Sequence, residues 1–301
     1  MGNPFDLADD SAYRAWRDAK LAAYPRRVEE LIVPLADPRH LSATEIAALA
    51  SACARANLAI YSAPHLPAAD KSLALALGRQ LGLERLEGNY LADEDGLSSI
   101  TPSEDETQVR GDFIPYTHKP INWHTDGYYN TSDRRILGMT LHCARDAEAG
   151  GENALLDHEI AYIQLRDANP EHIDALMQPD AMTIPARMDE ASVARAEQSG
   201  PVFSVDPAEG FLYMRYTART RSIAWRSDAR TQAAVKTLAD ILAGSEYVLT
   251  ARLTPGTGLV CNNVLHTRSG FSDSPGRRRL LYRGRYYDRL RFDRAPATAA
   301  A

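Results

Sequence analysis

The sequence has few cysteines, no long apolar run and no excess of basic residues. Its three cysteines, Cys53, Cys143 and Cys261, are widely spaced and form no Cys-x-x-Cys pair, which argues against a zinc ribbon or dithiol redox site. We expect reduced, mostly buried thiols in a cytoplasmic protein. No stretch approaches the ~18 apolar residues that span a bilayer. The formal net charge of −6 gives no general attraction for nucleic acid, so neither a nucleic-acid nor a membrane partner is expected.

Several common catalytic motifs are also missing. The chain contains no Gly-x-Gly-x-x-Gly, no Gly-rich loop ending in Lys and no Gly-x-Ser-x-Gly, which argues against a dinucleotide fold, a P-loop and an α/β-hydrolase elbow. Apolar residues make up 45% and charged residues 25% of the 301, as in ordinary globular proteins.

The order of predicted elements indicates a mainly β protein with helices, of the α+β class. Helical periodicity is found at residues 11–35, at 42–56 after the capping box Ser-Ala-Thr-Glu of residues 42–45, at 67–81, in a helix capped by Asp157, and at 228–243. The segments 201–205 and 211–216 are expected to form a hairpin around residues 206–210. Short strand signals dominate after residue 121 without a βαβ rhythm, which favours a sandwich or barrel. We expect one domain over 1–301: a helical α+β part (1–83), a substrate loop or lid (84–120), a β core with a helical insert (121–290) and a frayed tail (291–301).

Chemistry is concentrated around Ile-Asn-Trp-His-Thr-Asp-Gly at residues 121–127. On an extended strand, His124 and Asp126 would leave the same face. A histidine and a carboxylate are two thirds of the facial triad that holds non-haem Fe(II) and leaves positions open. His266, which follows an apolar run and two asparagines, is the best third ligand. By spacing alone, a surface His beside an Asp is the commoner case, whereas His142, inside an apolar strand, is expected to be a satisfied core histidine.

A basic run, Arg-Arg-Arg-Leu-Leu-Tyr-Arg at residues 277–283, follows His266. On a strand, Arg279 and Arg283 would share a face, where paired guanidinium groups need an anionic guest such as a carboxylate. The alternative is a solvated edge strand whose arginines discourage aggregation.

These blocks together resemble the taurine dioxygenase and clavaminate synthase superfamily of Fe(II)- and 2-oxoglutarate-dependent oxygenases. The resemblance covers residues 41–287 and is strongest at 122–126, at 141–157 and at 265–283. The middle block, with Leu-His-Cys and Gly-Gly-Glu-Asn, is also similar to the γ-butyrobetaine hydroxylase branch. The resemblance implies a double-stranded β-helix (jelly-roll) core with N-terminal and inserted helices.

Carried over residue by residue, the resemblance makes His124, Asp126 and His266 the iron ligands and catalytic centre. It makes Arg279 the anchor for 2-oxoglutarate, with Arg277 and Arg278 as competing registers. Arg283 would lie near the keto-acid or the substrate. Asn153 stands where the family usually has a Thr that bonds the same carboxylate, and its amide can also donate.

The implied reaction is hydroxylation of a small organic substrate with O2, releasing succinate and CO2. Tyr128 and Arg283 are the expected substrate contacts, and Tyr128 with Tyr129 suggests an aromatic site for an alkylammonium group. The resemblance also implies a homo-oligomer, a dimer or tetramer. Two alternatives stay open from the residues: a zinc-dependent hydrolase on the same triad, and a non-catalytic carboxylate-binding or sensing module.

Overall fold

The computed structural model describes residues 2–88, 92–103, 113–189, 192–219 and 223–292. The predictions for 89–91, 104–112 and 293–301, in the expected lid and tail, lie outside these residues. By internal contacts the chain divides into two compact units. Unit 1 comprises residues 1–24, 122–135 and 156–248, and unit 2 comprises residues 25–121, 136–155 and 249–301. The single oxygenase domain stays a prediction, and each unit is described by itself.

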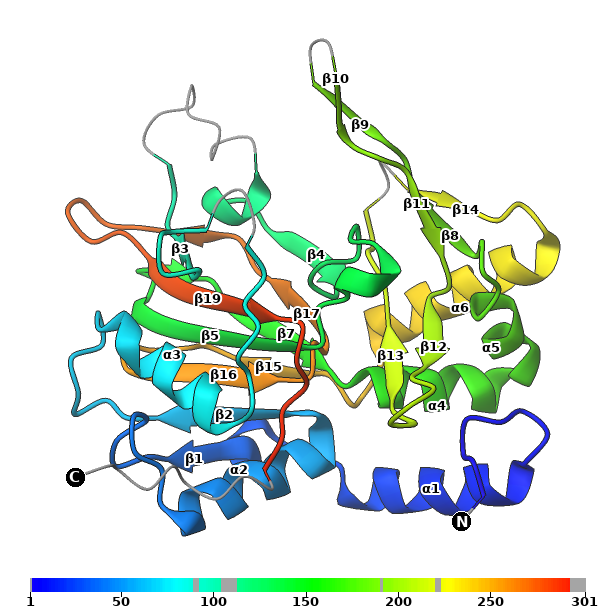
Figure 1. Ribbon diagram of the computed structural model, residues 1–301, viewed down its shortest axis with the longest axis horizontal. Coiled ribbons are helices and arrows are strands. Elements are labelled where there is room, and N and C mark those ends of the chain that lie inside the picture. The colour runs from blue at the N-terminus through cyan, green and yellow to red at the C-terminus, as the bar shows by residue number, and fades with distance from the viewer. Residues whose placement is uncertain (1, 89–91, 104–112, 190–191, 220–222, 293–301) are drawn as a thin grey trace. The chain divides into compact units, whose positions relative to one another are not determined.

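Unit 2 is built on a six-stranded sheet in the order β1-β2-β16-β5-β19-β3 (Figure 1). β1 runs parallel to β2, and the other neighbours are antiparallel. Its strands are β1 (Ile32–Pro34), β2 (Leu58–Ser62), β3 (Ser98–Ile100), β5 (Gly138–Arg145), β16 (Thr257–Cys261) and β19 (Leu280–Tyr286). Strands far apart in the sequence therefore lie side by side, as a jelly-roll core requires.

Two helices cover this sheet. α2 (Ala43–Ala56) packs on β1 and β2, and α3 (Lys71–Gln80) packs on β5 and β19. The predicted capping box is present: the Ser42 hydroxyl accepts from the Glu45 amide at 3.3 Å, and Glu45 accepts from the Ser42 amide at 2.7 Å. Among the described residues, unit 2 also contains the helical turns η1 (Val28–Leu31) and η3 (Ile114–Tyr116). It also contains the strands β6 (Ala149–Gly150), β7 (Asn153–Leu156, ending in unit 1), β15 (Leu249–Ala251), β17 (Leu265–Arg268) and β18 (Phe271–Ser272).

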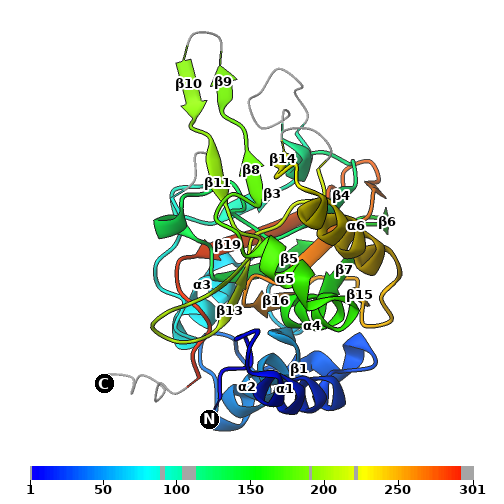
Figure 2. The same ribbon diagram turned by 90° about the vertical axis from the view of Figure 1, so that its right-hand side faces the viewer.

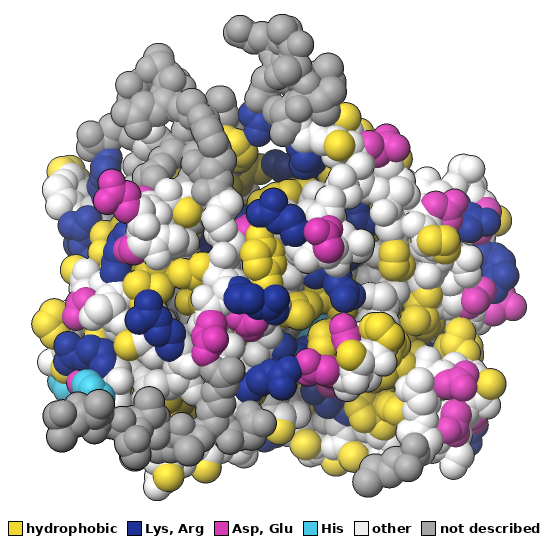
Figure 3. All heavy atoms as spheres, viewed as in Figure 1, with side chains coloured by type: hydrophobic (Ala, Val, Ile, Leu, Met, Phe, Trp, Pro, Cys, Tyr) yellow, Lys and Arg dark blue, Asp and Glu magenta, His cyan; other side chains and the backbone are white. Residues whose placement is uncertain are grey.

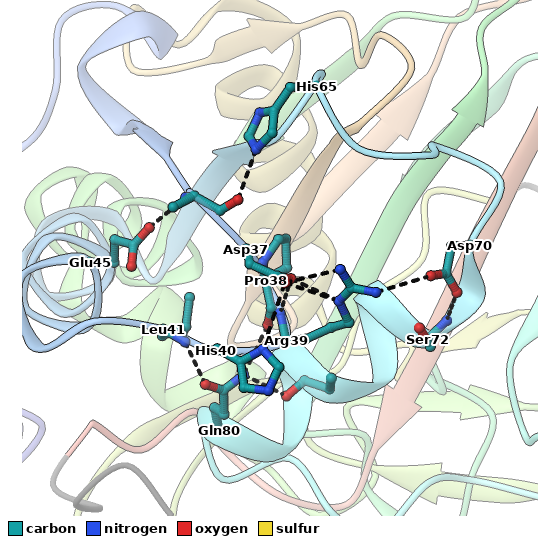
Figure 4. Close-up of polar contacts among 12 residues, drawn as sticks. Asp37, Pro38, Arg39, His40, Leu41, Glu45, His65, Asp70, Ser72 and Gln80 are labelled. Atoms are coloured by element: carbon teal, nitrogen blue, oxygen red, sulfur yellow. Dashed lines mark hydrogen bonds and ion pairs between the residues drawn. The ribbon is translucent and has the colours of Figure 1, made fainter. Parts of the chain in front are cut away.

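Side chains fix the connection from β1 to α2 (Figure 4). Gln80, at the end of α3, accepts from the Leu41 amide at 2.7 Å and donates to the Pro38 carbonyl at 2.9 Å. His65 Nε2 lies 2.8 Å from the Ala36 carbonyl. These contacts satisfy backbone groups that the sheet does not pair, and they hold the loop to α3 and to the segment after β2.

Unit 1 contains a cluster of three helices, α4 (His158–Ala168), α5 (Pro170–Leu176) and α6 (Ala229–Gly244), with α1 (Asp10–Ala23) packed on α4. Asp157 caps α4 as predicted, accepting from the Glu159 amide at 2.9 Å, and Asp228 caps α6. A hairpin of β12 (Phe203–Val205) and β13 (Leu212–Met214) confirms the predicted hairpin around residues 206–210.

A β-ribbon in unit 1 was not predicted. β8 (Met182–Ile184) pairs with β11 (Gln198–Gly200) and with β14 (Ala224–Trp225), and β9 (Arg187–Asp189) pairs with β10 (Ser192–Arg195). β9 and β10 continue outward from β8 and β11 in both views (Figures 1 and 2). β4 (Ile121–His124) enters unit 1 from residue 122, and η4 (Ser132–Arg134) follows it.

The distribution of surface charges and the burial of the cysteines agree with the expectations from the sequence. Basic and acidic side chains are interspersed over the face in Figure 3, without a field of one sign. All three cysteines are buried and free, as predicted. No helix among the described residues is long and apolar enough to cross a membrane.

Candidate metal and anion site

In unit 1, the His-x-Asp stretch is held by the segment that follows the β12–β13 hairpin. His124 forms an isolated bridge with Thr217, and the Ala218 amide donates to the Trp123 carbonyl at 2.8 Å. The Thr125 amide donates to the Tyr216 carbonyl at 3.0 Å. Backbone hydrogen bonds therefore fix this stretch on a rigid element, as a metal ligand requires.

The expected geometry of the pair needs one correction. β4 ends at His124, so Asp126 does not lie on the same strand; it opens the turn that follows. Gly127 has φ +69°, a conformation that favours glycine, and the Asn130 amide closes the turn onto the Gly127 carbonyl at 2.8 Å. The turn leaves the Asp126 carboxylate buried, at 4% exposure.

His124 and His266 are each oriented by a hydrogen bond to the backbone carbonyl two residues earlier. His124 Nδ1 lies 2.9 Å from the carbonyl of Asn122, and in unit 2 His266 Nδ1 lies 3.0 Å from the carbonyl of Val264. A carbonyl only accepts, so Nδ1 carries the proton and donates in each case. Nε2 is then the unprotonated nitrogen that can bind a metal, the arrangement typical of metal-ligating histidines.

Burial distinguishes the three adjacent arginines of unit 2. Arg277 is exposed and pairs with Asp146 at 2.6 Å, and Arg278 is half-buried. Arg279 is 5% exposed, and among the described residues no carboxylate lies within ion-pair distance of its guanidinium. The guanidinium carbon Cζ of Arg279 lies 5.0 Å from the centre of the Phe271 ring. Burial lowers the Arg279 pKa to about 10, so at neutral pH it is a buried cation suited to an anion.

The expected shared face of Arg279 and Arg283 is not realised by a regular strand. Arg279 precedes β19, and the pairing of β19 with β5 shifts register between Leu280 and Leu281. Both side chains nevertheless lie close enough to Arg268 to affect its pKa. Burial, followed by the charges of Arg279 and Arg283, lowers the Arg268 pKa to about 9. Arg285, also on β19, forms a buried ion pair with Glu87 and is therefore structural.

Arg268 is the residue whose importance sequence reasoning missed. It is 4% exposed and lies two positions after His266 on β17. Its guanidinium donates to the carbonyls of Pro115 at 2.9 Å and Thr117 at 2.7 Å, and also to that of Lys119. Arg268 thus ties residues 114–119 to the strand that carries His266. Its only sequence signal was its place in the motif at 265–271.

Asn153 has a contact that its predicted role did not include. Its Nδ2 donates to the Thr267 carbonyl at 2.8 Å, so the amide supports the strand beside His266. The position nearer to Arg279 is Gly151, φ +79°, where an added Cβ would stand 3.2 Å from Arg279 Nε. The expected role of Asn153 toward 2-oxoglutarate stays a prediction.

Comparison with known proteins gives the context of these features. Residues 19–285 match the family described as "Taurine catabolism dioxygenase TauD, TfdA family". A uridine-5'-phosphate dioxygenase from Amycolatopsis sp is 32% identical over 170 residues, covering 54% of this chain and 60% of that protein. The chain therefore spans less than two thirds of that curated relative.

Solved structures share the fold. An asparagine oxygenase in complex with Fe(II), 2S,3S-3-hydroxyasparagine and succinate aligns with TM-score 0.57 at 18% identity, covering 96% of this chain and 86% of that one. AAD-2 in complex with Mn(II) and N-oxalylglycine aligns with TM-score 0.58 at 14% identity, covering 87% and 97%. The predicted oxygenase fold is confirmed. The match over residues 19–285 identifies the chain as a member of the TauD/TfdA dioxygenase family.

Proposed function

We propose that the protein is an Fe(II)- and 2-oxoglutarate-dependent dioxygenase that hydroxylates a small organic substrate and releases succinate and CO2. His124, Asp126 and His266 are the metal ligands. The donor set fits the group: two neutral imidazoles and one carboxylate, each offering one ligand atom, are a set that suits non-haem Fe(II). Membership in a dioxygenase family supports the reaction class.

The observation that carries the proposal is the buried Arg279, which has no carboxylate at ion-pair distance among the described residues, in a chain that also has two histidines oriented through Nδ1 by backbone carbonyls. A keto-acid needs both a metal and an anchor for its far carboxylate. Arg279 supplies a planar, charged pair of donors for that carboxylate. When bound, the iron supplies the oxidising chemistry with O2.

Two other arginines of unit 2 have supporting roles in this proposal. Arg268 holds residues 114–119, and Arg283, half-buried near Arg268, adds positive charge on the side of the keto-acid or the substrate. A zinc hydrolase would need no keto-acid anchor, so Arg279 separates that alternative from the oxygenase. A carboxylate-binding module would keep the anchor, and the absence of 2-oxoglutarate turnover to succinate would identify it.

The test is anaerobic. Fe(II) and 2-oxoglutarate are added to metal-free protein, and the weak visible band of a keto-acid chelated to iron is recorded for wild type, Arg279→Ala and Arg277→Ala. Loss of a bidentate charged anchor should weaken 2-oxoglutarate binding by about tenfold or more. Arg277→Ala, which removes an exposed neighbour, should leave the band unchanged. A folded, metal-binding wild type without the band would refute the keto-acid reading.

For the substrate we propose a small phosphate ester, because the curated relatives are named for uridine-5'-phosphate. Tyr128 is the proposed substrate contact in unit 1. A cytoplasmic location and a dimer or tetramer complete the proposal. Size-exclusion chromatography with light scattering tests the oligomer, and a monomer would refute it.

A further inference from the structure

Unit 1 carries a group of arginines around the two tyrosines that follow Asp126. The backbone there is fixed by Arg215, which is 8% exposed and lies just after β13. Its Nε donates to the Tyr128 carbonyl at 2.7 Å, and its two NH groups donate to the carbonyls of Met182 at 2.9 Å and Gln198 at 2.8 Å. Arg215 therefore ties Tyr128 to the β8–β11 ribbon seen in Figures 1 and 2.

Two further arginines contact the side chains of the tyrosines. Arg219 NH1 donates to the Tyr128 hydroxyl at 3.2 Å, and the Arg195 guanidinium lies 5.6 Å from the centre of the Tyr129 ring. The two rings meet edge to face, with centres 5.1 Å apart and an angle of 81°. One compact group thus presents two cations and a phenol from β10, from the turn after Asp126 and from the segment after β13.

The side chains that the structure describes around this group supply no carboxylate to balance its positive charge. Among the residues that the structure describes, neither Arg195 nor Arg219 has a carboxylate within ion-pair distance. Arg195 uses one NH group for the Pro185 carbonyl at 2.8 Å, while its buried Nε has no hydrogen-bond partner in the described part of the chain. Burial lowers the Arg195 pKa, and nearby Arg187 and Arg219 lower it further, whereas Tyr128 and Tyr129 raise it.

An unpartnered buried donor beside an exposed guanidinium is costly without an anion. The same charges would repel the alkylammonium group that the two tyrosines suggested in the sequence. Guanidinium forks match phosphate oxygens in geometry, and a phosphate monoester carries about −1.5 to −2 charges near neutral pH.

We propose that Arg195, Arg219 and the Tyr128 hydroxyl form a subsite for the tetrahedral oxyanion of the substrate, a phosphate monoester. The subsite deepens the proposed function and rests on it, because it names the part of the chain that selects the substrate. It is separate from Arg279, which belongs to unit 2 and is proposed to bind the keto-acid.

The test compares uridine-5'-phosphate with uridine by calorimetry on protein loaded anaerobically with Fe(II) and 2-oxoglutarate. Wild type, Arg219→Gln, Arg219→Lys, Tyr128→Phe and Arg195→Gln are measured, with Arg14→Gln as the matched control. Arg14 lies on α1 in the same unit and forms an exposed ion pair with Asp10 at 2.8 Å. It is not part of the proposed subsite, so its replacement removes one exposed arginine without changing the subsite. Taurine is a third probe, because its sulfonate has the same tetrahedral shape.

In wild type, uridine-5'-phosphate should bind at least about tenfold more tightly than uridine. This ratio should fall by about tenfold in Arg219→Gln and Arg195→Gln, fall less in Arg219→Lys and Tyr128→Phe, and stay unchanged in Arg14→Gln. Arg219 is exposed, so its variants test the proposal even where Arg195→Gln fails to fold.

Three results would overturn the subsite: no binding of uridine-5'-phosphate at millimolar concentration, equal binding of the two probes, or a ratio that survives in Arg219→Gln. Taurine binding with the same dependence on Arg219, without uridine-5'-phosphate binding, would overturn the phosphate assignment. The visible band of the keto-acid complex is read on the same samples. A band without phosphate selectivity refutes the subsite alone, whereas phosphate selectivity without a band supports the subsite and refutes the proposed reaction.

Discussion

Replacing Lys20 by Met should destabilise unit 1 strongly, because Lys20 compensates two acids at the start of α4. Its ammonium lies 2.7 Å from Asp157 and 2.6 Å from Glu159. The Lys20 side chain is 6% exposed, that of Asp157 0% and that of Glu159 14%. Lys20→Met keeps the apolar stem but leaves the Asp157 carboxylate buried without a cation.

The magnitude follows from burial. Removing one partner of a buried ion pair costs roughly 3–5 kcal/mol. Asp157 keeps the hydrogen bond from the Glu159 amide at 2.9 Å, and Glu159 can turn toward water. We therefore expect the lower end, about 3 kcal/mol in the free energy of unfolding near pH 7.

The pH dependence gives a second, independent signature. In the wild type, burial tends to raise the Asp157 pKa, but the Lys20 ammonium and other contacts outweigh it, so the pKa is lowered. This carboxylate then contributes stability above the unfolded pKa of about 3.9, which is lost as pH falls through the lower folded value. In Lys20→Met the largest opposing contact is lost and only the contacts with His158 and the Glu159 amide still lower the Asp157 pKa. We therefore expect burial to raise the folded pKa above the unfolded one, so that the penalty shrinks as pH falls.

Urea unfolding at about pH 7 and about pH 5 measures both effects. Lys236→Met is the matched control, since Lys236 pairs with Asp240 at 2.7 Å but both side chains are exposed, and little change is expected. Lys20→Met/Asp157→Asn should recover part of the loss, because the amide keeps the cap without a charge. Equal losses in Lys20→Met and Lys236→Met, or a Lys20→Met loss that grows toward pH 5, would refute the reasoning.

Three further changes have defined outcomes. Arg285→Met should cost several kcal/mol in urea unfolding, because the partner Glu87 is only 5% exposed; a loss as small as that of Lys236→Met would contradict this. Ser42→Ala should lower the free energy of unfolding by about 1 kcal/mol, since the α2 capping box is lost, and Ser42→Asn should not. Arg268→Met should increase protease cleavage within residues 114–119, whose carbonyls it binds, and an unchanged cleavage pattern would refute the clamp.

The sequence predicts elements best where local chemistry decides the structure. The Ser42 capping box, the Asp157 cap and the hairpin at 206–210 were all readable from a few neighbouring residues. His142 was also interpreted correctly. His142 is fully buried, and burial lowers its pKa. Its Nδ1 lies 2.7 Å from the Tyr61 hydroxyl and its Nε2 lies 2.8 Å from the Ala68 carbonyl.

Predictions failed where contacts with backbone groups that are distant in the sequence determine the local structure. The β8–β11 ribbon has strands of only three residues, which are too short for a recognisable period in the sequence. Arg215 holds the ribbon through carbonyls on three separate segments. No spacing rule reports such a contact, because every acceptor is a main-chain oxygen. The same holds for Arg268. The even spacing of Arg279 and Arg283 suggested a shared strand face, but Arg279 lies before β19 begins, next to a register shift in the pairing of β19 with β5, so one regular strand does not carry both residues.

The proposed metal ligands His124, Asp126 and His266 make a final prediction possible. A metal that binds the folded chain and not the unfolded one stabilises the folded state. At a metal concentration of about 100 times Kd, the gain is roughly 2.7 kcal/mol. Thermal unfolding with Mn(II) should show this gain in wild type and in His40→Ala, whose side chain is exposed. His124→Ala and His266→Ala should each lose most of it. Full stabilisation of His266→Ala by Mn(II) would exclude His266 as a ligand.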